Sequence, residues 1–551
     1  MSSSQGNRQR VSALKPRLLI ALVCLLSVMA ALPHASQANL QSALTQNTGF
    51  KEQARDFIPG EILVRFRNLE VAKRKVGTLS KLQAEGREIA VSVEQFAGSD
   101  IVEGLRLARV APEDTLKATE ALNAQADVLY AEPNYIRRKD AAPNDPRYAE
   151  QWALKNTVPT GADIDAEQIW DTTTGSRNVV VGVVDEGIDI NHPDLRENIW
   201  RNPAETPANN LDDDGNGFVD DVNGYDFFHQ DASVYDGNAG DSYTDAHGTH
   251  VAGTIGAHSN NGEGVAGVNW QVSLMSLKIL GREDENPAPG SVLTTVQAYS
   301  YAKMMRDTWV SSGGARGANL RVLNNSYGGF GHSQAELDAI LALGQSGILF
   351  VASAGNDSSD NDRLAHYPSN HNTPNMISVA SSGRSDVLSP FSNYGRRSVS
   401  MAAPGQEILS TTPNGTYTVA SGTSMASPHV AGAAALLLAV KPDVSVERLR
   451  AAIIYSGDEL YDGGTKIITG RRLNAANALQ NLNETDTTPP GAINDLRIFD
   501  QNNRNLTLQW TEPGDDATSG AVSVYQMRFS DSAIQNEAQF EQARPLLMPR
   551  P

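Results

Sequence analysis

The sequence predicts an α/β protein, in which a doubly wound, mainly parallel sheet follows a small α/β unit and precedes a β-sandwich-like segment. Three observations lead to this prediction. In the central part of the chain, short apolar runs rich in β-branched residues alternate with helical patterns, as in parallel sheets covered on both faces. The part before it mixes strand and helix patterns, whereas the part after it shows only strand-like alternation. Polar linkers separate the three parts.

The composition is that of a large globular protein. The chain has 551 residues, enough for three or four folding units of about 150 residues each. Hydrophobic residues make up 40% and charged residues 20%, which excludes a wholly disordered chain. The 64 acidic residues outnumber the 45 basic ones and give a net charge of −19, so no nucleic-acid partner is expected.

Residues 1–38 have the layout of a secretory signal peptide. Basic residues precede the apolar run Leu18–Leu32, and small residues follow up to Ala38. The run is shorter than the roughly 20 residues that span a bilayer, which disfavours a transmembrane anchor. Cleavage after Ala38 would remove Cys24, the single cysteine, and leave a chain without disulfides. We therefore expect a secreted, extracellular protein with no membrane segment once the signal is removed.

Residues 39–143 are predicted to form an open-faced, ferredoxin-like α/β unit. Its expected order is strand, helix, strand, strand, helix, strand. The first helix is rich in Lys, Leu and Ala, and the second covers Glu113–Asn123. The strands are expected at Glu61–Phe66, Ile89–Val93, Leu105–Val110 and Val128–Tyr130.

Residues 144–483 are predicted to form the doubly wound domain. Its buried strands are expected at Val179–Val184, Val272–Leu280, Leu320–Leu323 and Ile348–Ala352. Right-handed crossovers place helices on both faces of such a sheet, and chemistry gathers at the carboxyl ends of its strands. Asp185 follows one of these strands, and Asn356 follows another.

Residues 484–551 begin with a polar linker and continue with strand-like alternation. The alternating runs are Leu496–Ile498, Leu506–Trp510 and Val522–Phe529. A seven-stranded sandwich needs about 100 residues, so the segment is expected to be a partial or irregular sandwich.

Three short blocks carry residues suited to catalysis. Asp185 stands at a strand end before a glycine turn, His247 begins a helix of small residues, and Ser424 precedes a helix without charges. Serine is a weak nucleophile at neutral pH and needs an adjacent base. The base in turn needs a group that fixes its tautomer and stabilises its cationic form. A carboxylate, an imidazole and a hydroxyl on three elements of one sheet can supply these roles.

The three blocks resemble those of the subtilisin-like serine proteases (subtilases), in the order Asp, His, Ser along the chain. The resemblance covers residues 144–481 and implies hydrolysis of peptide bonds through an acyl-enzyme intermediate. It implies that Asp185 orients His247, that His247 acts as general base and then acid, and that Ser424 attacks the scissile carbonyl. By the same resemblance, Asn356 donates its side-chain amide to the oxyanion beside the Ser424 backbone N–H.

The resemblance also indicates how substrate is held. Residues 325–329 resemble the edge strand that pairs with an extended substrate, and they include Asn325, Ser326, Tyr327 and Gly328. Main-chain pairing accepts many sequences, so we expect an endopeptidase of broad specificity. His366 falls where many relatives have a small residue at the base of the pocket for the P1 side chain, and is expected to narrow that pocket.

An acidic stretch has the ligand spacing of an EF-hand calcium loop. The loop begins at Asp212, with oxygen donors at positions one, three, five and nine, a glycine at position six and a main-chain carbonyl at position seven. The donors are Asp212, Asp214, Asn216, Phe218 and Asp220. Position twelve is Asn223 rather than Glu, so bidentate closure is lacking, and a solvated acidic turn remains the alternative.

A second calcium site follows from the resemblance to thermitase-like subtilases. It implies that Asp145, Asp194 and Asn261 hold the ion together with carbonyls of the loop 259–265. A secreted chain without thiols gains stability from such ions, because each one binds only the native state. Ca²⁺ is therefore the expected cofactor.

The terminal segments also resemble known modules. Residues 57–138 are similar to subtilase propeptides, which assist folding and inhibit the enzyme, so self-cleavage is expected between Arg138 and Asn144. The alternative is an independent N-terminal domain that stays attached. Residues 489–516 resemble a fibronectin type III module, expected to serve in attachment or spacing.

The expected partners are protein and peptide substrates and the protein's own propeptide as an intramolecular inhibitor, with the enzyme acting as a monomer. Two other functions stay open at this stage. A serine-carboxyl peptidase of the sedolisin kind shares a Gly-Thr-Ser signature, but His247 argues against it. A calcium-dependent adhesion protein with an inert catalytic block is the other.

Overall fold

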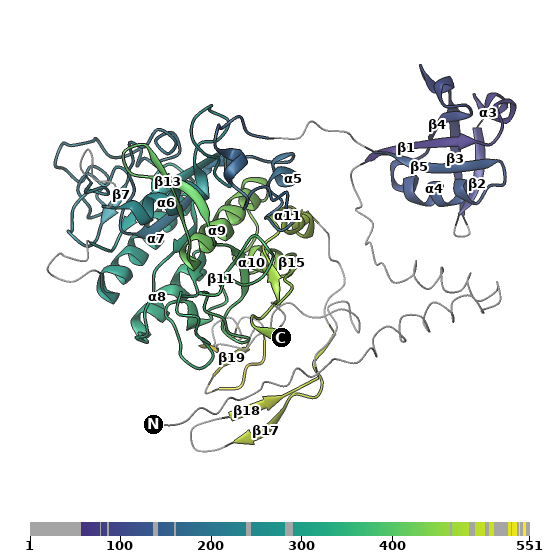
Figure 1. The fold of residues 1–551 in the computed structure, drawn as a ribbon. Helices are drawn as coiled ribbons and strands as arrows, with labels where there is room; N and C mark the ends of the chain where they lie inside the picture. Colours follow the sequence, from purple (N-terminus) through teal and green to yellow (C-terminus); the bar gives the residue numbers. More distant parts are fainter. Residues whose placement is uncertain are drawn as a thin grey trace, which may run out of the picture. The chain divides into compact units, whose positions relative to one another are not determined.

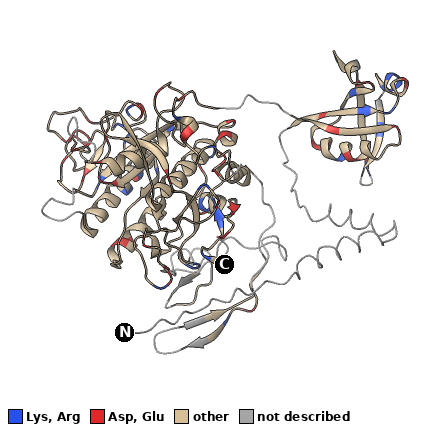
Figure 2. Cartoon of the chain, viewed as in Figure 1, with Lys and Arg blue, Asp and Glu red and all other residues tan. Residues whose placement is uncertain are grey.

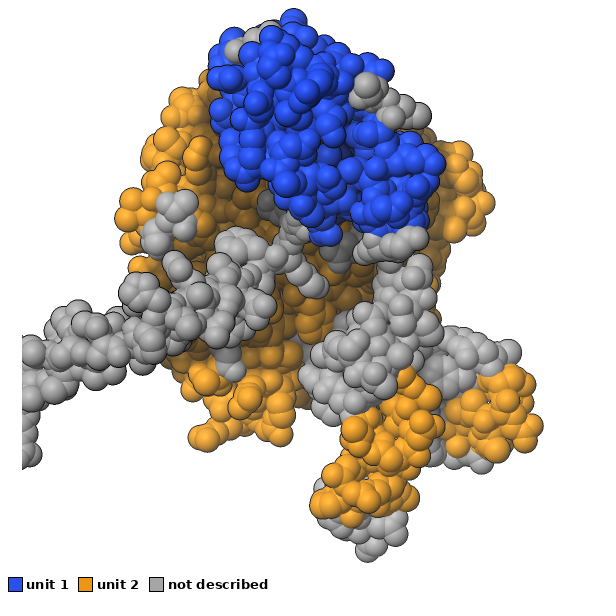
Figure 3. Space-filling view, turned by 90° about the vertical axis from the view of Figure 1, so that its right-hand side faces the viewer, with its two compact units in different colours: residues 1–138 blue, residues 139–551 orange. Residues whose placement is uncertain are grey.

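The computed structural model describes most of the chain between residues 57 and 546. The described ranges are 57–135, 142–483, 491–501, 506–511 and 527–546, apart from gaps at 78, 85–86, 159–160, 238–243, 282–289, 463–464, 531, 537–538 and 540–543. The predicted signal segment and most of the predicted cleavage region lie outside the described residues. The chain divides into two compact units, residues 1–138 and 139–551, which Figure 3 colours separately.

Unit 1 is an antiparallel sheet with the strand order β2-β3-β4-β1-β5. Helices α3 and α4 pack against it, and Ile62, Val91 and Leu122 are among the residues of its buried core. Its elements are β1 Phe57–Phe66, α3 Leu69–Lys75, β2 Leu79–Ala84, β3 Arg87–Glu94, β4 Leu105–Arg109, α4 Thr115–Asn123 and β5 Val128–Tyr135.

One strand of unit 1 was not predicted. The expected order has a single helix between the first strand and Ile89, but the structure ends α3 at Lys75 and forms β2 over Leu79–Ala84. Leu, Lys, Gln and Ala in this segment are good helix formers. Pairing with β3 along its whole length, from Leu79 opposite Ser92 to Ala84 opposite Arg87, overrides that local preference.

Unit 2 is built on a nine-stranded sheet with the order β15-β16-β12-β11-β10-β9-β6-β8-β7. Neighbouring strands are parallel except β15 and β16, and the four buried strands predicted from the sequence are all present. The strands are β6 Gly175–Asp185, β7 Gly224–Asp226, β8 Gln271–Lys278, β9 Leu320–Asn325, β10 Leu349–Ser353, β11 Met376–Ser382, β12 Met401–Pro404, β15 Asp458–Glu459 and β16 Arg471–Arg472.

Helices cover both faces of this sheet (Figure 1). Val181 and Val183 of β6 belong to the core shared with α6, α9 and α10, whereas Val180 and Val184 belong to the core shared with α7 and α8. The sheet is therefore doubly wound, as predicted. The helices are α5 Ala166–Trp170, α6 Ala246–Gly256, α7 Val292–Ser311, α8 Gln334–Gln345, α9 Thr423–Val440, α10 Val446–Tyr455 and α11 Ala475–Asn483.

Helix α9 runs through the core of unit 2. Among the described helices it is the one long and apolar enough to cross a membrane, but 83% of its apolar window is buried inside the protein. It contacts β6, β9, β10, β11 and β12 on one side and α6 on the other. A helix without charges is stable in this position because it is surrounded by apolar side chains, so α9 is a core helix.

The topology brings distant segments to one rim of the sheet. From β6 the chain builds outward to β7 and β8 on one side and then crosses to β9, β10 and β11 on the other. Reversal of the winding direction opens a crevice at the carboxyl ends of the strands. Asp185 ends β6 at this rim, and helices α6 and α9 contact each other and β6.

The remaining strands form hairpins. In unit 2, β13 Ile408–Thr412 pairs with β14 Thr416–Ala420 and packs against α6. Near the C-terminus, β17 Arg497–Gln501 pairs with β18 Leu506–Gln509, and β19 Met527–Phe529 pairs with β20 Arg544–Leu546. The described part of this region contains the two hairpins, and the predicted sandwich stays a prediction.

Candidate active site

Asp185 and His247 form a hydrogen-bonded pair at the rim of the sheet. Asp185 is 1% exposed at the end of β6, and its Oδ1 accepts from His247 Nδ1 at 2.8 Å. The backbone N–H of Glu186 donates to the same oxygen at 2.9 Å. Because Nδ1 carries the proton toward the carboxylate, Nε2 is the unprotonated nitrogen of the neutral ring. The pair therefore presents a basic nitrogen at the rim.

Glu186, which follows Asp185, fixes the start of helix α6. Its Oε1 accepts from the backbone N–H of His247 at 2.6 Å, which satisfies one of the free donors of the first helical turn. The local sequence pattern does not indicate this contact. Glu186 therefore places a second negative charge beside the imidazole.

The charges around His247 outweigh the effect of its burial. Burial lowers the pKa of His247, but the charge and hydrogen bond of Asp185 raise it, and Glu186 raises it further, so that the pKa lies above its ordinary value. The imidazolium form is thus stabilised, as a general base requires once it has taken a proton.

Replacing Glu186 with glutamine is expected to shift the acid limb of kcat/KM to lower pH. A histidine acts as a base only when neutral, so activity that depends on His247 would rise as pH passes upward through its pKa. Loss of the Glu186 charge lowers that pKa. A pH–rate profile measures the shift, with Glu447→Gln, on the exposed start of α10, as control. An acid limb at the wild-type pH in Glu186→Gln would show that this charge does not act on His247.

A buried lysine holds this region together. Lys278, at the end of β8, has a side chain only 2% exposed, and its ammonium donates to the Glu186 carbonyl and, at 2.6 Å, to Asp245 Oδ1. It also pairs with Asp236 at 3.1 Å. Burial lowers the pKa of Lys278, but these carboxylates outweigh it and raise the pKa, so the group stays charged. Asp245 directly precedes α6, so Lys278 ties the start of that helix to the end of β6.

Ser424 lies in the first turn of α9 and is partly exposed. Its Oγ donates to the Ser326 carbonyl at 3.2 Å, and Ser326 Oγ donates to the Ser424 carbonyl at 2.9 Å. In the described part of the chain, no hydrogen bond engages Nε2 of His247. The structure thus brings Ser424 to the same rim as the Asp185–His247 pair, with its hydroxyl turned toward the segment after β9.

Asn356, which follows β10, is oriented by Thr423. Its Oδ1 accepts from the Thr423 backbone N–H at 2.8 Å and from Thr423 Oγ1 at 2.9 Å, so its Nδ2 points to the opposite side. A β-carbon on Gly422 would lie 3.5 Å from Asn356 Nδ2 and 3.6 Å from the Ser424 backbone N. Two N–H donors therefore flank one point beside Ser424, an arrangement suited to a developing oxyanion. The role of Thr423 was not predicted.

The predicted substrate segment is only partly accessible. Asn325 is fully buried in β9, an interior strand, and its Nδ2 donates to the Leu323 and Val351 carbonyls at 3.2 Å. Its side chain therefore belongs to the core, which corrects its prediction as a substrate-binding residue. Tyr327 is also engaged, through its hydroxyl, with Tyr299.

Gly328 is exposed, and His366 lies next to it with 7% exposure. The neighbouring Gly329 pairs through its backbone with Tyr367, at 2.7 and 2.8 Å. The segment after β9 is thus fixed to the segment that contains His366. Ser326 is also buried, at 4% exposure, so the exposed part of the predicted edge strand is limited to residues after Ser326.

The acidic loop after β6 gathers three carboxylates that could hold a metal ion. These are Glu205, Asp212 and Asp214, whose ligand atoms all lie within 4.8 Å of one another. Glu205 is 8% exposed; its Oε1 accepts from the backbone N–H groups of Asp213 and Asp214, while its Oε2 is buried without a partner. An unpaired buried carboxylate oxygen fits a cation. In Figure 2 the ribbon is coloured red at Asp and Glu residues.

The EF-hand spacing is only partly reflected in this loop. Asp220, the expected donor at position nine, turns both carboxylate oxygens to the backbone N–H groups of Asn209 and Asn210, at 3.1 and 2.9 Å. Asn216 uses its Oδ1 to accept from the Phe218 N–H at 2.8 Å. Glu205, which precedes the loop, lies in the carboxylate cluster with Asp212 and Asp214, whereas Asp220 is not part of that cluster. Since Glu205 lies outside the twelve-residue pattern, the pattern could not indicate it.

The residues of the second predicted calcium site also come together. Asp194 is fully buried and accepts from Asn261 Nδ2 at 3.0 Å, and Asp145 accepts from the Asn260 N–H at 2.7 Å. Asp145 Oδ1 is buried without a partner. Burial, and to a smaller extent the Asp194 charge, raise the pKa of Asp145. Two buried carboxylates of like charge fit a cation between them.

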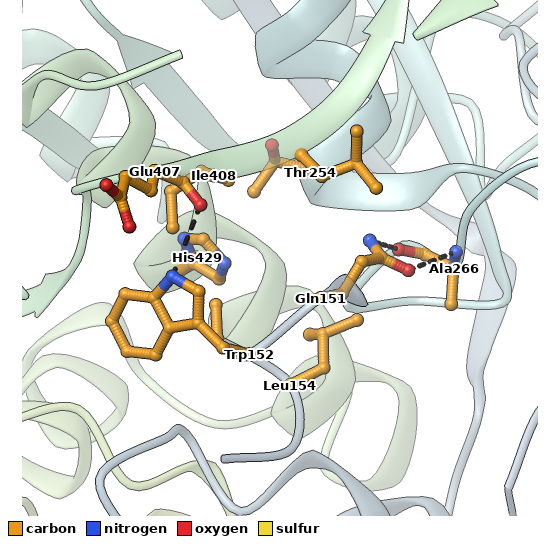
Figure 4. Close-up of a pocket in the computed structure, with 10 residues that line it drawn as sticks. Gln151, Trp152, Leu154, Thr254, Ala266, Glu407, Ile408 and His429 are labelled. Carbon is orange, nitrogen blue, oxygen red and sulfur yellow. Dashed lines mark hydrogen bonds between the residues drawn. The ribbon is translucent and has the colours of Figure 1, made fainter. Parts of the chain in front are cut away.

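Two buried histidines near the rim are structural. His250 Nε2 contacts the carbonyls of Ile408 and Thr418 at 3.1 Å, and His429 Nδ1 donates to the Met425 carbonyl at 2.8 Å. Burial lowers the pKa of each to about 4, so both are neutral. His429 lines the narrow pocket in Figure 4, where Trp152 and Gln151 are hydrogen-bonded to neighbouring loops. Asp185, His247, Asn356 and Ser424 are not among the residues that line this pocket.

A serine at the start of a helix, a histidine paired with aspartate and two convergent amide donors on a doubly wound sheet define a serine hydrolase. Residues 176–480 match the model of the subtilase family, and residues 44–134 match that of the fervidolysin N-terminal prodomain. The chain belongs to the subtilase family of serine proteases and carries a prodomain.

Several characterised proteins are similar to this chain. The thermophilic serine proteinase of Bacillus sp. strain AK1 is 31% identical over 425 residues, 77% of this chain and 88% of that protein. Thermitase of Thermoactinomyces vulgaris is 32% identical over 339 residues, 61% of this chain and 99% of that protein. An extracellular protease of Xanthomonas campestris pv. campestris is 32% identical over 386 residues, 64% of this chain and 58% of that protein.

Proposed function

We propose that the chain is a secreted, calcium-stabilised serine endopeptidase, made as a zymogen that removes its own prodomain. Asp185 orients His247, His247 takes and returns the proton, and Ser424 is the nucleophile. Asn356 Nδ2 and the Ser424 N–H bind the oxyanion. The substrates are proteins and peptides, and the prodomain is the intramolecular inhibitor.

The observation that carries this proposal is the shared position of Asn356 Nδ2 and the Ser424 N, 3.5 and 3.6 Å from one point beside the nucleophile. A carbonyl oxygen placed there would have its carbon next to Ser424 Oγ. Such donors stabilise charge that develops only in the transition state, which makes them a feature of acyl transfer rather than of simple binding.

The catalytic sequence follows from the contacts. On substrate binding, Ser424 Oγ turns from the Ser326 carbonyl to Nε2 of His247, since hydrogen bonds at unliganded sites often tighten only in the complex. Oγ attacks the carbonyl carbon as its proton passes to Nε2, and the oxyanion forms between the two donors. His247 then gives the proton to the leaving amine. Water then attacks the acyl-enzyme carbonyl while its proton passes to Nε2 of His247. His247 returns this proton to Ser424 Oγ as the carboxylic acid product leaves.

Labelling with a fluorophosphonate tests the proposal, because only an activated serine reacts quickly. Mass spectrometry should locate the label on Ser424 in the processed protein, and His247→Ala should lose it. Labelling and hydrolysis near neutral pH contradict an acid-acting serine-carboxyl peptidase. Absence of labelling would support the adhesion protein with an inert site and overturn the proposal.

Secretion is supported from two sides. Residues 1–38 have the layout of a signal peptide. The similar protein of Xanthomonas campestris is named an extracellular protease. A prodomain also suits export, because it keeps a protease inactive until the enzyme has left the cell that makes it.

Calcium binding is supported by the buried orphan oxygens of the two acidic sites. In the loop site, Glu205, Asp212 and Asp214 would be the carboxylate ligands, with Asn216 and the Phe218 carbonyl as further predicted donors. In the second site, Asp145 and Asp194 would hold the ion with Asn261 and carbonyls of the loop 259–265. Bound Ca²⁺ would supply positive charge that each site otherwise lacks.

Chelation is expected to lower the melting temperature by about 5 °C or more. When the free Ca²⁺ concentration is a hundred times the Kd, removing the ion lowers the free energy of unfolding by about 2.7 kcal/mol. One kcal/mol corresponds to a shift of roughly 2–4 °C in the melting temperature of a large domain. Melting is measured with and without EDTA on the Ser424→Ala protein, which cannot digest itself during heating.

The loop site is tested separately with Glu205→Gln, which should weaken Ca²⁺ binding in calorimetric titration. Asp213→Asn is the matched control, because the Asp213 side chain lies outside the cluster and accepts from Thr206 N and Asn209 Nδ2. Equal melting with and without chelator would remove calcium from the proposed function.

A further inference from the structure

His366 lies directly behind the two segments that flank Ser424. A β-carbon on Gly328 would be 2.0 Å from His366 Cε1 and 2.6 Å from its Nε2. A β-carbon on Gly355 would be 3.0 Å from His366 Cδ2. Distances this short mean that only glycine fits at Gly328 beside the ring. The imidazole therefore occupies the space that Gly328 leaves open and borders the space beside Gly355, where Asn393 Nδ2 would be nearer to a β-carbon, at 2.4 Å.

The two segments also contact the nucleophile. Ser326, two residues before Gly328, accepts from Ser424 Oγ at 3.2 Å. Asn356, which follows Gly355, bonds to Thr423 beside Ser424. An acyl group on Ser424 Oγ, with its oxygen between Asn356 Nδ2 and the Ser424 N, would direct its α-carbon toward these segments. Their glycines provide the opening for the side chain on the acyl side of the scissile bond, the P1 side chain.

The His366 ring is held in place and cannot easily leave this opening. It is 7% exposed, its Nδ1 lies 3.3 Å from Ser369 Oγ, and the Phe330 ring meets it edge-on with centroids 6.2 Å apart. Ser369 Oγ donates to the His366 carbonyl at 2.7 Å, so the hydroxyl is left to accept from Nδ1. Burial lowers the pKa of His366, so the ring is neutral near pH 7 and offers no charge to a P1 side chain.

We propose that His366 closes the floor of the P1 pocket and makes the protease select small P1 residues, namely Gly, Ala and Ser. The inference rests on the proposed function. Because the substrate pairs through main-chain groups, the positions other than P1 accept many side chains, and selection between substrates acts mainly at P1. A large P1 side chain would have to displace the ring from its contacts with Gly328, Gly355 and Ser369.

The experiment compares kcat/KM for peptide anilides that differ only at P1, with Ala, Leu or Phe. The wild-type enzyme is expected to prefer Ala over Phe by about tenfold or more, the discrimination that a few methylenes provide in a tight pocket. His366→Gly is expected to raise the ratio of kcat/KM for the Phe substrate to that for the Ala substrate by about tenfold or more. His332→Ala, an exposed histidine of a neighbouring segment, should leave this ratio unchanged.

A preference of the wild type for Phe or Leu over Ala would overturn the inference while leaving the proposed function intact. The same holds for an unchanged P1 preference in His366→Gly protein whose serine is fully labelled by fluorophosphonate. Should His366→Gly fail to fold, the same P1 comparison is made with His366→Ala. In addition, the wild-type enzyme digests an unfolded protein, and mass spectrometry of the products shows whether cleavage follows mainly small P1 residues. Absence of both labelling and hydrolysis in the wild type would instead be a failure of the proposed function.

Discussion

Replacing Ser424 with alanine is expected to leave the purified full-length chain uncleaved and to lower kcat for peptide hydrolysis by about 10⁶-fold, the magnitude known for the nucleophile of subtilisin, another subtilase. Without Oγ no acyl-enzyme can form, although Asn356 Nδ2 and the Ser424 N–H remain in place. Binding of a peptide should therefore persist while its cleavage stops. Electrophoresis and mass spectrometry of the secreted protein measure the processing, and anilide hydrolysis measures the residual rate.

Processing in trans provides the control. Added wild-type enzyme should cut the Ser424→Ala chain within the predicted region between Arg138 and Asn144, which would establish that the cleavage site is accessible. Ser427→Ala is a matched variant, because Ser427 lies in the same helix but donates to Asn324 Oδ1 at 2.7 Å, away from the substrate side. Normal processing of pure Ser424→Ala protein would contradict autocatalysis.

The sequence could predict those features of the site that depend on local pattern. Asp185 follows a continuous β-branched run, and such a run ends at the chemical rim of a parallel sheet. Ser424 precedes a helix without charges, whose burial follows from its composition. The strand β2 shows the limit of this approach, because its residues favour a helix and only pairing with β3 makes it a strand.

Contacts between distant segments could not be predicted in the same way. Lys278 and Asp245 are separated by 33 residues, and nothing in either segment indicates that the lysine is buried against that carboxylate. Glu205 joins the metal-site candidates because the chain folds back on the loop, whereas the EF-hand pattern directed attention to Asp220. Thr423 is part of the Gly-Thr-Ser motif, but its hydrogen bond to Asn356 can be seen only in the three-dimensional structure.

These contacts share a function at the rim. Lys278 donates hydrogen bonds to Asp245 and to the Glu186 carbonyl, and the Glu186 side chain accepts from the backbone N–H of His247. The residues before and after the start of α6 are thereby linked to the end of β6, which holds His247 beside Asp185. Thr423 holds Asn356 in the same manner on the oxyanion side. Catalytic groups must be kept near their productive geometry before substrate arrives, because reorganisation at the moment of reaction costs rate.

Replacing Asn356 with alanine is expected to lower kcat by about 10²–10³-fold with little change in KM, the loss known for an oxyanion donor of subtilisin. The amide donates to charge that is present in the transition state and absent in the bound substrate, so its removal acts on kcat. Asn356→Asp should be at least as damaging. It keeps the oxygen that accepts from Thr423 but places an acceptor where the oxyanion needs a donor.

A cycle with Thr423→Val separates donation from positioning. Thr423→Val removes the hydroxyl that donates to Asn356 Oδ1 at 2.9 Å and keeps the backbone N–H, so a loss of about tenfold is expected. In the Asn356→Ala background the same change should cost little, because no amide is left to orient. Equal losses in both backgrounds would mean that Thr423 acts through its other contact, the N–H of Gly355 at 3.1 Å, and not through the oxyanion donor.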